Sequence, residues 1–315
     1  MNIGSFLKLV EIQTKVASII PYLLGTTFAL YKFENFNIKN AVTLFMSMLI
    51  FDMTTTTINN YMDYKKAIKK HGFGYETHNA IVKDKLNPTL VLFTIVSMFI
   101  VSAILGLVLF LRTDIIVLLL GVISFAIGVL YSFGPIPISR TPFGEIFSGF
   151  TMGFIITFLA MYIHIFDQNI IGINLVNNTL NLSFNINIII SLLIVTLPAV
   201  AGISNIMLAN NICDMDDDIV NKRYTLPIYI GKEKALSTFK WVYYIGFLAI
   251  VVEVFMKILP VVSLLTLIAL KPVSDNIKAF NKLQSKKDTF VLSVKNFVIV
   301  NIIYIASILL AIVLK

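Results

Sequence analysis

The sequence predicts an all-α, polytopic membrane protein with about nine transmembrane helices. Of its 315 residues, 57% are hydrophobic and only 13% are charged, whereas a soluble domain carries about 25% charged residues. The apolar residues come in runs of about twenty, the length of helix that crosses a bilayer. A transmembrane β-barrel would need short segments of alternating hydrophobicity instead. Composition and run length therefore exclude a soluble enzyme and favour a single integral-membrane domain over residues 1–315.

Nine apolar runs bounded by charged residues define the predicted spans. They cover residues 17–33, 41–58, 89–111, 115–133, 144–166, 187–208, 236–256, 258–274 and 290–313. The seventh and eighth runs meet around Lys257 and Pro260. There the chain could form two short spans joined by a tight turn, or one long bent helix, and the number of spans depends on which of these is right.

The distribution of Lys and Arg predicts the orientation of these spans. With the N-terminus inside, only five of the 25 basic residues fall outside, and these are Lys32, Lys39, Arg112, Lys257 and Lys315. Cytosolic loops of membrane proteins carry such an excess of basic residues. We therefore expect a multi-pass protein of the cell membrane with its N-terminus inside and its C-terminus outside. The formal net charge of +8 is explained by topology, and no nucleic-acid partner is expected.

Three loops between the spans are long. Two are cytosolic and polar, at residues 64–88 and 209–235, which indicates a built structure on that side. The outer segment 167–186 is rich in Asn and lacks Lys and Arg, and we expect a solvated loop there.

A short polar pattern, NNxxD, occurs twice, at the cytosolic ends of the second and sixth spans. The copies are Asn59 to Asp63 and Asn210 to Asp214. Residues three or four apart share one face of a helix, so Asn59 points with Asp63, and either Asn210 or Asn211 points with Asp214. The two spans run in the same direction, so the copies can face each other across a bundle. This is the pattern of a parallel internal duplication.

The carboxylates around the second copy predict a metal site. Asp214 is followed by Asp216, Asp217 and Asp218, a run that repels itself without a counter-ion. Oxygen ligands without His or Cys suit Mg²⁺, which binds through few carboxylates and leaves positions for phosphate oxygens. The predicted metal ligands are Asn59, Asp63, Asp214 and Asp218. The predicted ligand of this metal is a diphosphate.

Other residues on the same side of the membrane could contribute to such a site. Asp52 lies on one helical stripe with Thr56, Asn59 and Asp63, and a carboxylate at that depth should face a polar cavity; its role is open. Basic residues that could hold phosphate oxygens are Lys15, Lys83, Lys85, Lys222 and Arg223. The turn at Tyr131 and Ser132, with the nearby Glu145, either lines the same pocket or is an ordinary loop.

Over nearly its whole length, the chain resembles the UbiA superfamily of intramembrane aromatic prenyltransferases. It is most similar to the 1,4-dihydroxy-2-naphthoate polyprenyltransferase branch, through residues 15–25, 131–137 with 144–145, and 222–227. The family motif NDxxDxxxD lies over Asn59, Asn60, Asp63 and Ala67, and the motif DxxxD lies over Asp214 and Asp218. Asn60 replaces the usual Asp, and Ala67 stands where the naphthoate branch commonly has Gly. The second motif is therefore the stronger metal anchor.

The resemblance implies a central cavity whose cytosolic mouth is capped by the two acidic motifs and their loops. It also implies Mg²⁺-dependent transfer of a polyprenyl group from a polyprenyl diphosphate to an aromatic acceptor, 1,4-dihydroxy-2-naphthoate, in menaquinone biosynthesis, with membrane lipid as the surroundings. The implied catalytic residues are Asp63, Asp214, Asp218 and Tyr131, and the implied substrate-binding residues are Lys15, Asn59, Asn60, Asn211, Lys222, Arg223 and Ser132.

Two alternatives remain open at the level of the sequence. The first is another acceptor, such as 4-hydroxybenzoate or a haem or chlorin ring. The second is a cation-coupled membrane transporter whose acidic clusters coordinate the ion. Transporter sites usually lie near the bilayer midplane, whereas these clusters lie at one membrane face.

Overall fold

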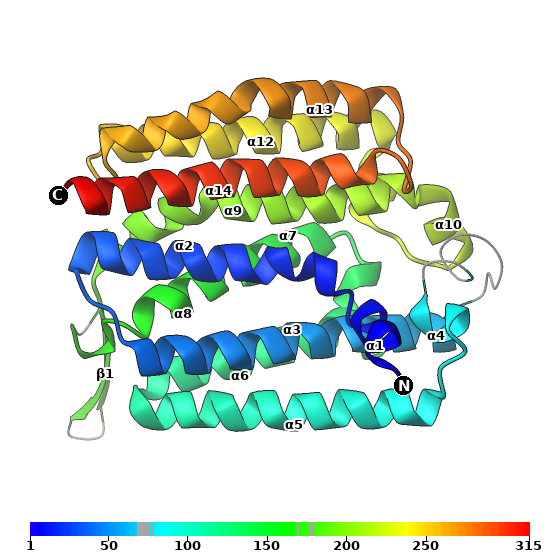
Figure 1. The fold of residues 1–315 in the computed structure, drawn as a ribbon, viewed down its shortest axis with the longest axis horizontal. Helices are drawn as coiled ribbons and strands as arrows, with labels where there is room; N and C mark the ends of the chain where they lie inside the picture. Colours follow the sequence, from blue (N-terminus) through cyan, green and yellow to red (C-terminus); the bar gives the residue numbers. More distant parts are fainter. Residues whose placement is uncertain (68–75, 77–78, 169, 177–178) are drawn as a thin grey trace.

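The computed structural model describes residues 1–67, 76, 79–168, 170–176 and 179–315, and its secondary structure is mainly helical (Figure 1). The α-helices are α1 (Ile3–Leu9), α2 (Val16–Phe33), α3 (Ile38–Lys66), α4 (Ala80–Lys83), α5 (Pro88–Arg112), α6 (Ile115–Ser132), α7 (Gly144–Ser148), α8 (Ile156–Tyr162), α9 (Ile186–Cys213), α10 (Met215–Val220), α11 (Leu226–Ile230), α12 (Lys232–Phe255), α13 (Leu270–Lys282) and α14 (Phe290–Leu314). The other elements are the 3₁₀ segments η1 (Ile12–Lys15), η3 (Ile138–Arg140), η5 (Phe166–Gln168) and η6 (Val261–Ala269), the π-helical segment η4 (Gly149–Ile155), and strands β1 (Ile171–Val176) and β2 (Thr179–Phe184).

Within the described part of the chain, eight helical segments are long and apolar enough to cross a bilayer. They are Ile12–Phe33, Ile38–Lys66, Pro88–Arg112, Ile115–Ser132, Gly144–Tyr162, Ile186–Cys213, Lys232–Phe255 and Phe290–Leu314. Each matches one predicted span. The remaining predicted span, 258–274, forms η6 and the start of α13, which pack against α12 and α14. The predicted class, an all-α polytopic membrane protein, is confirmed.

The join between the seventh and eighth spans is a tight turn. Helix α12 ends at Phe255, Lys257 has a φ of 57°, and Pro260 precedes η6. A left-handed residue followed by a proline cannot continue an α-helix. The sequence allowed one long bent helix or two segments joined by a tight turn, and the structure has the tight turn, with α12 before it and η6 running into α13 after it.

The long helices run side by side in two groups, with α2 and α7–η4–α8 between them (Figure 1). Helices α3, α5 and α6 pack together in one group, and α9, α12 and α14 pack together in the other. The N-terminus, α1, α4 and α10 lie at one end of the bundle, while the C-terminus and β1 lie at the other. The described parts of both predicted cap loops therefore gather at the end that holds the N-terminus.

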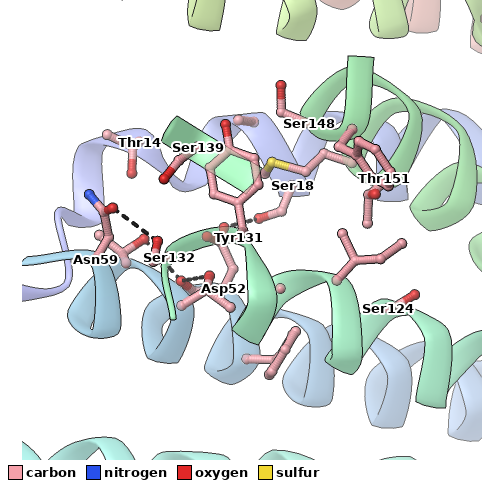
Figure 2. A pocket seen from close by; sticks show the side chains of 18 of the residues that line it. Thr14, Ser18, Asp52, Asn59, Ser124, Tyr131, Ser132, Ser139, Ser148 and Thr151 are labelled. Atoms are coloured by element: carbon pink, nitrogen blue, oxygen red, sulfur yellow. Dashed lines mark hydrogen bonds between the residues drawn. The ribbon is translucent and has the colours of Figure 1, made fainter. Parts of the chain in front are cut away.

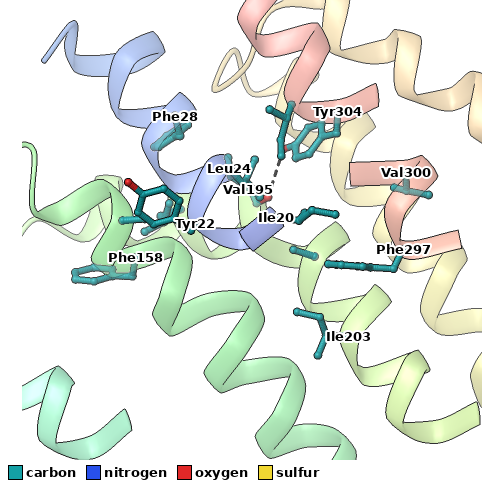
Figure 3. Close-up of a cluster of buried hydrophobic side chains, with 14 of the residues drawn as sticks. Ile20, Tyr22, Leu24, Phe28, Phe158, Val195, Ile203, Phe297, Val300 and Tyr304 are labelled. Atoms are coloured by element: carbon teal, nitrogen blue, oxygen red, sulfur yellow. Dashed lines mark hydrogen bonds between the residues drawn. The ribbon is translucent and has the colours of Figure 1, made fainter. Parts of the chain in front are cut away.

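The main core lies where α2, α9 and α14 meet (Figure 3). Leu24 of α2, Val195 of α9 and Phe297 of α14 belong to one buried apolar cluster. The hydroxyl of Tyr304 donates to the Val195 carbonyl oxygen across 3.4 Å and also contacts the buried carboxylate of Glu253. A carboxylate inside the apolar part of the bundle thus has a hydrogen-bonding partner, as its depth requires.

A glycine lets α2 approach α8 closely. A Cβ atom at Gly25 would lie 2.2 Å from the carbonyl oxygen of Thr157, so no side chain fits there. The Thr157 hydroxyl donates to the Pro21 carbonyl oxygen at 3.1 Å and joins the same two helices. Small residues with hydroxyl contacts are the usual means of close helix packing in membranes.

The segment 167–186, which we predicted to lie outside as a loop, forms a β-hairpin. β1 and β2 pair antiparallel, with Ile171 opposite Phe184 and Ile173 opposite Leu182. The backbone N–H of Asn185 donates to the Ile170 carbonyl oxygen at 2.8 Å and closes the hairpin. Apolar and polar residues alternate along both strands, which is a strand pattern. The expectation was wrong because it used the Asn content and ignored this alternation.

The close approach at Gly25 gives a test of the packing. We expect Gly25→Ala to lower the Tm of the purified protein by several degrees, because relieving the clash with Thr157 must push α2 and α8 apart; overpacking of this kind costs about 1–3 kcal/mol. The control is Gly121→Ala on α6, where a Cβ meets nothing within 4 Å. Ala is a better helix former than Gly, so the control should keep or raise the Tm. Equal Tm values for the two variants would contradict this account.

Candidate active site

A cavity of about 950 Å³ lies inside the bundle, lined by α3, α6, α7, η4 and α9. Most of its wall is apolar, with Phe51, Phe99 and Phe125 among the lining residues. Polar side chains also line it, and those of Asp52, Tyr131 and others are drawn in Figure 2. One end is strongly charged. We call that end the ionic cluster, and it consists of Asp63, Asp214, Asp218, Arg140, Arg223 and Lys286.

The two copies of NNxxD have the same local geometry. On α3, the Asn59 amide donates to the Asp63 carboxylate at 3.3 Å, and on α9 the Asn210 amide donates to the Asp214 carboxylate at 3.4 Å. All four residues line the cavity. Because the spacing is four residues, each Asn and Asp share a helix face. Of the two candidates left open by the sequence, it is Asn210 that points with Asp214.

The second Asn of each copy is buried in the scaffold. The Asn60 amide donates to the Leu9 carbonyl oxygen at 3.0 Å and to the Glu11 carboxylate at 3.2 Å. The Asn211 amide donates to the Glu145 carboxylate at 2.8 Å. Asn60 is 4% and Asn211 is 1% exposed. Asn60 ties α3 to the N-terminal segment and also lines the cavity, whereas Asn211 ties α9 to α7 and is not among the lining residues. The predicted substrate contacts of both residues remain predictions.

Arg223 joins the two acidic motifs. Its Nε lies 3.2 Å from the Asp218 carboxylate of α10, and its Nη1 lies 3.8 Å from the Asp63 carboxylate of α3. Burial raises the pKa of Asp218 to about 6, although the charge of Arg223 opposes the rise. Burial by itself would lower the pKa of Arg223. The negative charges of the surrounding carboxylates, of which Asp218 has the largest effect, outweigh burial and raise the pKa of Arg223. Further positive charge beside Asp218 would stabilise its ionised form.

Two other basic residues of the ionic cluster were not singled out in the sequence. Lys286, just before α14, contacts the Asp214 carboxylate at 2.5 Å and also the Asn210 side-chain oxygen. Arg140 lines the cavity from the end of η3. Burial lowers the pKa of Arg140, and the nearby charge of Arg223 adds to the effect. In the sequence both look like ordinary cytosolic basic residues, since only the fold brings them to the acidic motifs.

The turn after α6 does line the cavity. The Tyr131 side chain faces it (Figure 2), with its hydroxyl 3.4 Å from the Gly144 carbonyl oxygen. The Ser132 hydroxyl donates to the Asn59 side-chain oxygen at 2.9 Å. Asn59 therefore receives a hydrogen bond from Ser132 and gives one to Asp63, which fixes the orientation of its amide. The pocket-lining interpretation agrees with the structure for Tyr131 and Ser132, whereas Glu145 is buried against Asn211 and is not among the lining residues.

Lys15 and Lys222 lie away from the ionic cluster. Lys15 is 2% exposed, and its Nζ donates to the Asp52 carboxylate at 2.8 Å, to the Asp52 carbonyl oxygen at 3.2 Å and to the Thr56 hydroxyl at 2.7 Å. Lys222 is exposed, with a φ of 54°, and does not line the cavity. The predicted phosphate contacts of these two residues remain predictions. Lys83 and Lys85 also lie outside the cavity lining.

The donor set of the ionic cluster suits Mg²⁺ without forming a closed metal cage. Carboxylate and amide oxygens come from Asp63, Asp214, Asp218 and Asn59. Among the described residues, no three His, Cys, Asp or Glu side chains are close enough together to hold a metal ion. Mg²⁺ does not need such a cage, because it commonly binds one or two carboxylates together with substrate phosphates and water. These residues therefore fit a metal that is shared with a phosphate ligand.

Measurements of stability can test whether the second Asn of each NNxxD copy supports the fold more than the first Asn does. We expect Asn60→Ala and Asn211→Ala to lower the Tm by several degrees, because each leaves buried partners without a hydrogen bond, at a cost of about 1–3 kcal/mol. Asn59→Ala and Asn210→Ala, at the equivalent positions facing the cavity, should change the Tm much less. The reverse order, measured by thermal unfolding in detergent, would refute the assignment.

Comparison with known proteins identifies the family. Residues 18–308 match the UbiA prenyltransferase family. The chain is 29% identical to the 1,4-dihydroxy-2-naphthoate octaprenyltransferase of Bacillus subtilis (strain 168) over 232 residues, which cover 71% of this chain and 65% of that protein. The match thus spans just under two thirds of the relative's length.

Solved structures of the family share the fold. A UbiA homologue from Aeropyrum pernix K1 in its apo form superposes with a TM-score of 0.67 and 16% identity, over 93% of this chain and 97% of that one. A UbiA homologue from Archaeoglobus fulgidus, bound to DMAPP and Mg²⁺, gives a TM-score of 0.62 and 14% identity over 99% and 100% of the two chains. With the family matched over most of its length and the same fold throughout, this chain belongs to the UbiA prenyltransferase family.

Proposed function

We propose that this protein transfers a polyprenyl group from a polyprenyl diphosphate to 1,4-dihydroxy-2-naphthoate in menaquinone biosynthesis. The observation that carries the proposal is a single cavity with a charged end and apolar walls. A polyprenyl diphosphate has the same division, with a charged head and an apolar chain. The choice of the naphthoate acceptor is supported by the similarity to the Bacillus subtilis relative.

Mg²⁺ is the metal that we propose for this reaction. Asp63, Asp214, Asp218 and Asn59 would hold it, since their oxygen atoms are the ligands that it prefers. Mg²⁺ would neutralise charge on the departing diphosphate and so make it a better leaving group. The Archaeoglobus fulgidus homologue, which is bound to DMAPP and Mg²⁺, supports this proposal.

The basic residues of the ionic cluster would bind the diphosphate itself. Arg223 already spans Asp63 and Asp218, and its planar guanidinium can grip two phosphate oxygens at once. Lys286 stands over Asp214 as a compact positive charge. We infer that both cations shift from their carboxylates toward the diphosphate when it binds. This exchange leaves the carboxylate oxygens available as metal ligands.

The apolar part of the cavity would hold the prenyl chain and shelter the reacting carbon. As the bond to diphosphate breaks, the allylic carbon becomes positive, and the face of an aromatic ring stabilises such charge by about 0.5–2 kcal/mol. Tyr131 is well placed, because its side chain faces the cavity near Asn59 (Figure 2). The electron-rich ring of the acceptor would then attack that carbon.

We further propose that the whole chain is one domain of the cell membrane, with its N-terminus and the ionic cluster on the cytosolic side. The positive charge bias of the loops supports this orientation, and the two termini lie at opposite ends of the bundle (Figure 1). Such placement lets soluble diphosphate leave into the cytosol while the product remains in the membrane.

Product formation tests the proposal directly. Purified protein in detergent would be given geranylgeranyl diphosphate, Mg²⁺ and either 1,4-dihydroxy-2-naphthoate or 4-hydroxybenzoate, and products identified by mass spectrometry. We expect a prenylated 1,4-naphthalenediol that has lost the acceptor carboxylate as CO₂, detected as the quinone after oxidation by air, and absent when EDTA removes the metal. Product from 4-hydroxybenzoate alone would change the acceptor, and folded protein that forms no product and releases no diphosphate would refute the function.

Variants at the junction of α9 and α10 complete this test. Asp214→Ala and Asp218→Ala should lower kcat by on the order of 100-fold or more, as expected when a group that stabilises leaving-group charge is removed. Asp216→Ala is the matched control, because Asp216 is exposed and does not line the cavity. Folding of each variant would be checked by its Tm.

The adjacent residues Lys286 and Lys287 offer a second matched pair. Lys286 contacts Asp214, whereas Lys287 is exposed and does not line the cavity. We expect Lys286→Met to raise the KM for prenyl diphosphate by about tenfold, the loss expected for a hydrogen bond to a charged group, and Lys287→Met to leave it unchanged. Equal KM values for the two variants would remove Lys286 from the diphosphate site.

A further inference from the structure

A second charged group faces the cavity, deeper than the ionic cluster. Asp52 of α3 lines the cavity together with Ser18 and Thr14 (Figure 2), and Thr56 is also a lining residue. Asp52 precedes Asn59 by seven residues on the same helix, which places it about 10 Å further along the helix axis. The reaction chemistry proposed above gives this carboxylate no task.

The carboxylate of Asp52 is fixed but not saturated. One oxygen accepts from Lys15 Nζ at 2.8 Å, and the other accepts from the Ser18 hydroxyl at 2.6 Å. Lys15 Nζ also donates hydrogen bonds to the Asp52 carbonyl oxygen and to the Thr56 hydroxyl. A carboxylate can accept about four hydrogen bonds, so each oxygen retains capacity for one more. The side chain is 13% exposed, and it lines the cavity.

Aromatic side chains line the same cavity as Asp52. Phe51 and Phe125 stack with ring centroids 3.8 Å apart, and both line the cavity. Gly128 adds no side chain to the wall, and a Cβ there would lie 2.7 Å from the Phe51 ring. Aromatic faces and edges beside a hydrogen-bond acceptor can recognise a ring that carries a hydroxyl group.

We propose that Asp52 binds the aromatic acceptor by accepting a hydrogen bond from one of its ring hydroxyl groups. The inference rests on the proposed prenyl-transfer function. The proton stays on the hydroxyl oxygen, so the carboxylate aligns the ring and increases its electron density without any bond being broken. Lys15 and Ser18 are positioning residues that hold the carboxylate toward the cavity. The acceptor thus lies deep, with its ring between Asp52 and the reacting carbon.

The chain contains a matched pair that serves as the control. Asp84 accepts from Lys8 Nζ at 3.1 Å and from the Ser5 hydroxyl at 2.7 Å, which are the same partner types as those of Asp52. None of these three residues lines the cavity. Asp84→Asn therefore measures how much activity changes when an Asp loses its contacts with a Lys and a Ser at a position away from the cavity.

The experiment compares Asp52→Asn and Asp84→Asn with the unaltered protein, using 1,4-dihydroxy-2-naphthoate and each of its two monomethyl ethers as acceptors. We expect Asp52→Asn to lower kcat/KM for the dihydroxy acceptor by about 10- to 100-fold, the loss expected for a hydrogen bond to a charged group, while the KM for prenyl diphosphate stays within about twofold. For the unaltered protein, one of the two methyl ethers should have a kcat/KM that is lower than that of the dihydroxy acceptor by a similar factor. For Asp52→Asn, that ether and the dihydroxy acceptor should have equal kcat/KM, because the variant has already lost the same hydrogen bond. Asp84→Asn should match the unaltered protein.

Two results would overturn the assignment while leaving the function intact. One is an equal loss for Asp52→Asn with the dihydroxy acceptor and with both ethers. The other is a raised KM for prenyl diphosphate in place of a loss for the acceptor. If the unaltered protein prenylates no acceptor, the function fails and the assignment with it.

Folding is controlled by a second variant. If Asp52→Asn lowers the Tm, the double variant Lys15→Gln and Asp52→Asn removes both charges together and leaves no buried charge unpaired. The double variant should also have equal kcat/KM for the dihydroxy acceptor and for that methyl ether. A double variant that still discriminates between hydroxyl and ether would refute the hydrogen bond to Asp52.

Discussion

The position of every charge inside this bundle is constrained by the cost of an unpaired charge in hydrocarbon, about 2.5–3.5 kcal/mol for Asp at the centre of an inserted helix. Where carboxylates lie within the predicted spans, they have partners: Glu253 contacts Tyr304, and Asp52 is held by Lys15 and Ser18. The acidic motifs avoid the cost by lying at helix ends, where Arg223 and Lys286 reach them. This constraint separates a charged cavity end from an apolar interior.

Helix geometry then decides which residue of each repeat faces that end. With 3.6 residues per turn, positions four apart nearly eclipse each other, whereas adjacent positions diverge by about 100°. Asn59 and Asn210 therefore stand beside Asp63 and Asp214 in the cavity wall. Their neighbours in the sequence, Asn60 and Asn211, are buried and brace α3 and α9, although Asn60 also borders the cavity. A repeat of five residues supplies both the site and its support.

The proposed chemistry follows the same order along α3. Asp63 belongs to the charged end, Asn59 stands about one turn deeper, and Asp52 about two turns deeper still. The diphosphate, the allylic carbon and the acceptor ring would occupy successive levels of one cavity. Burying the acceptor beneath the prenyl group keeps water from the allylic cation, which water would otherwise capture.

The sequence by itself determined the membrane class, the spans and the two acidic motifs, because these depend on run length, charge and spacing along a helix. It did not determine whether Asn210 or Asn211 faces the cavity, since both precede Asp214 by a workable spacing. Only the tertiary structure brought Lys286 to Asp214 across 72 residues of sequence and Lys15 to Asp52 across 37. Contacts between distant helices leave no periodic signal in one sequence, because they depend on how the helices are packed and rotated against each other.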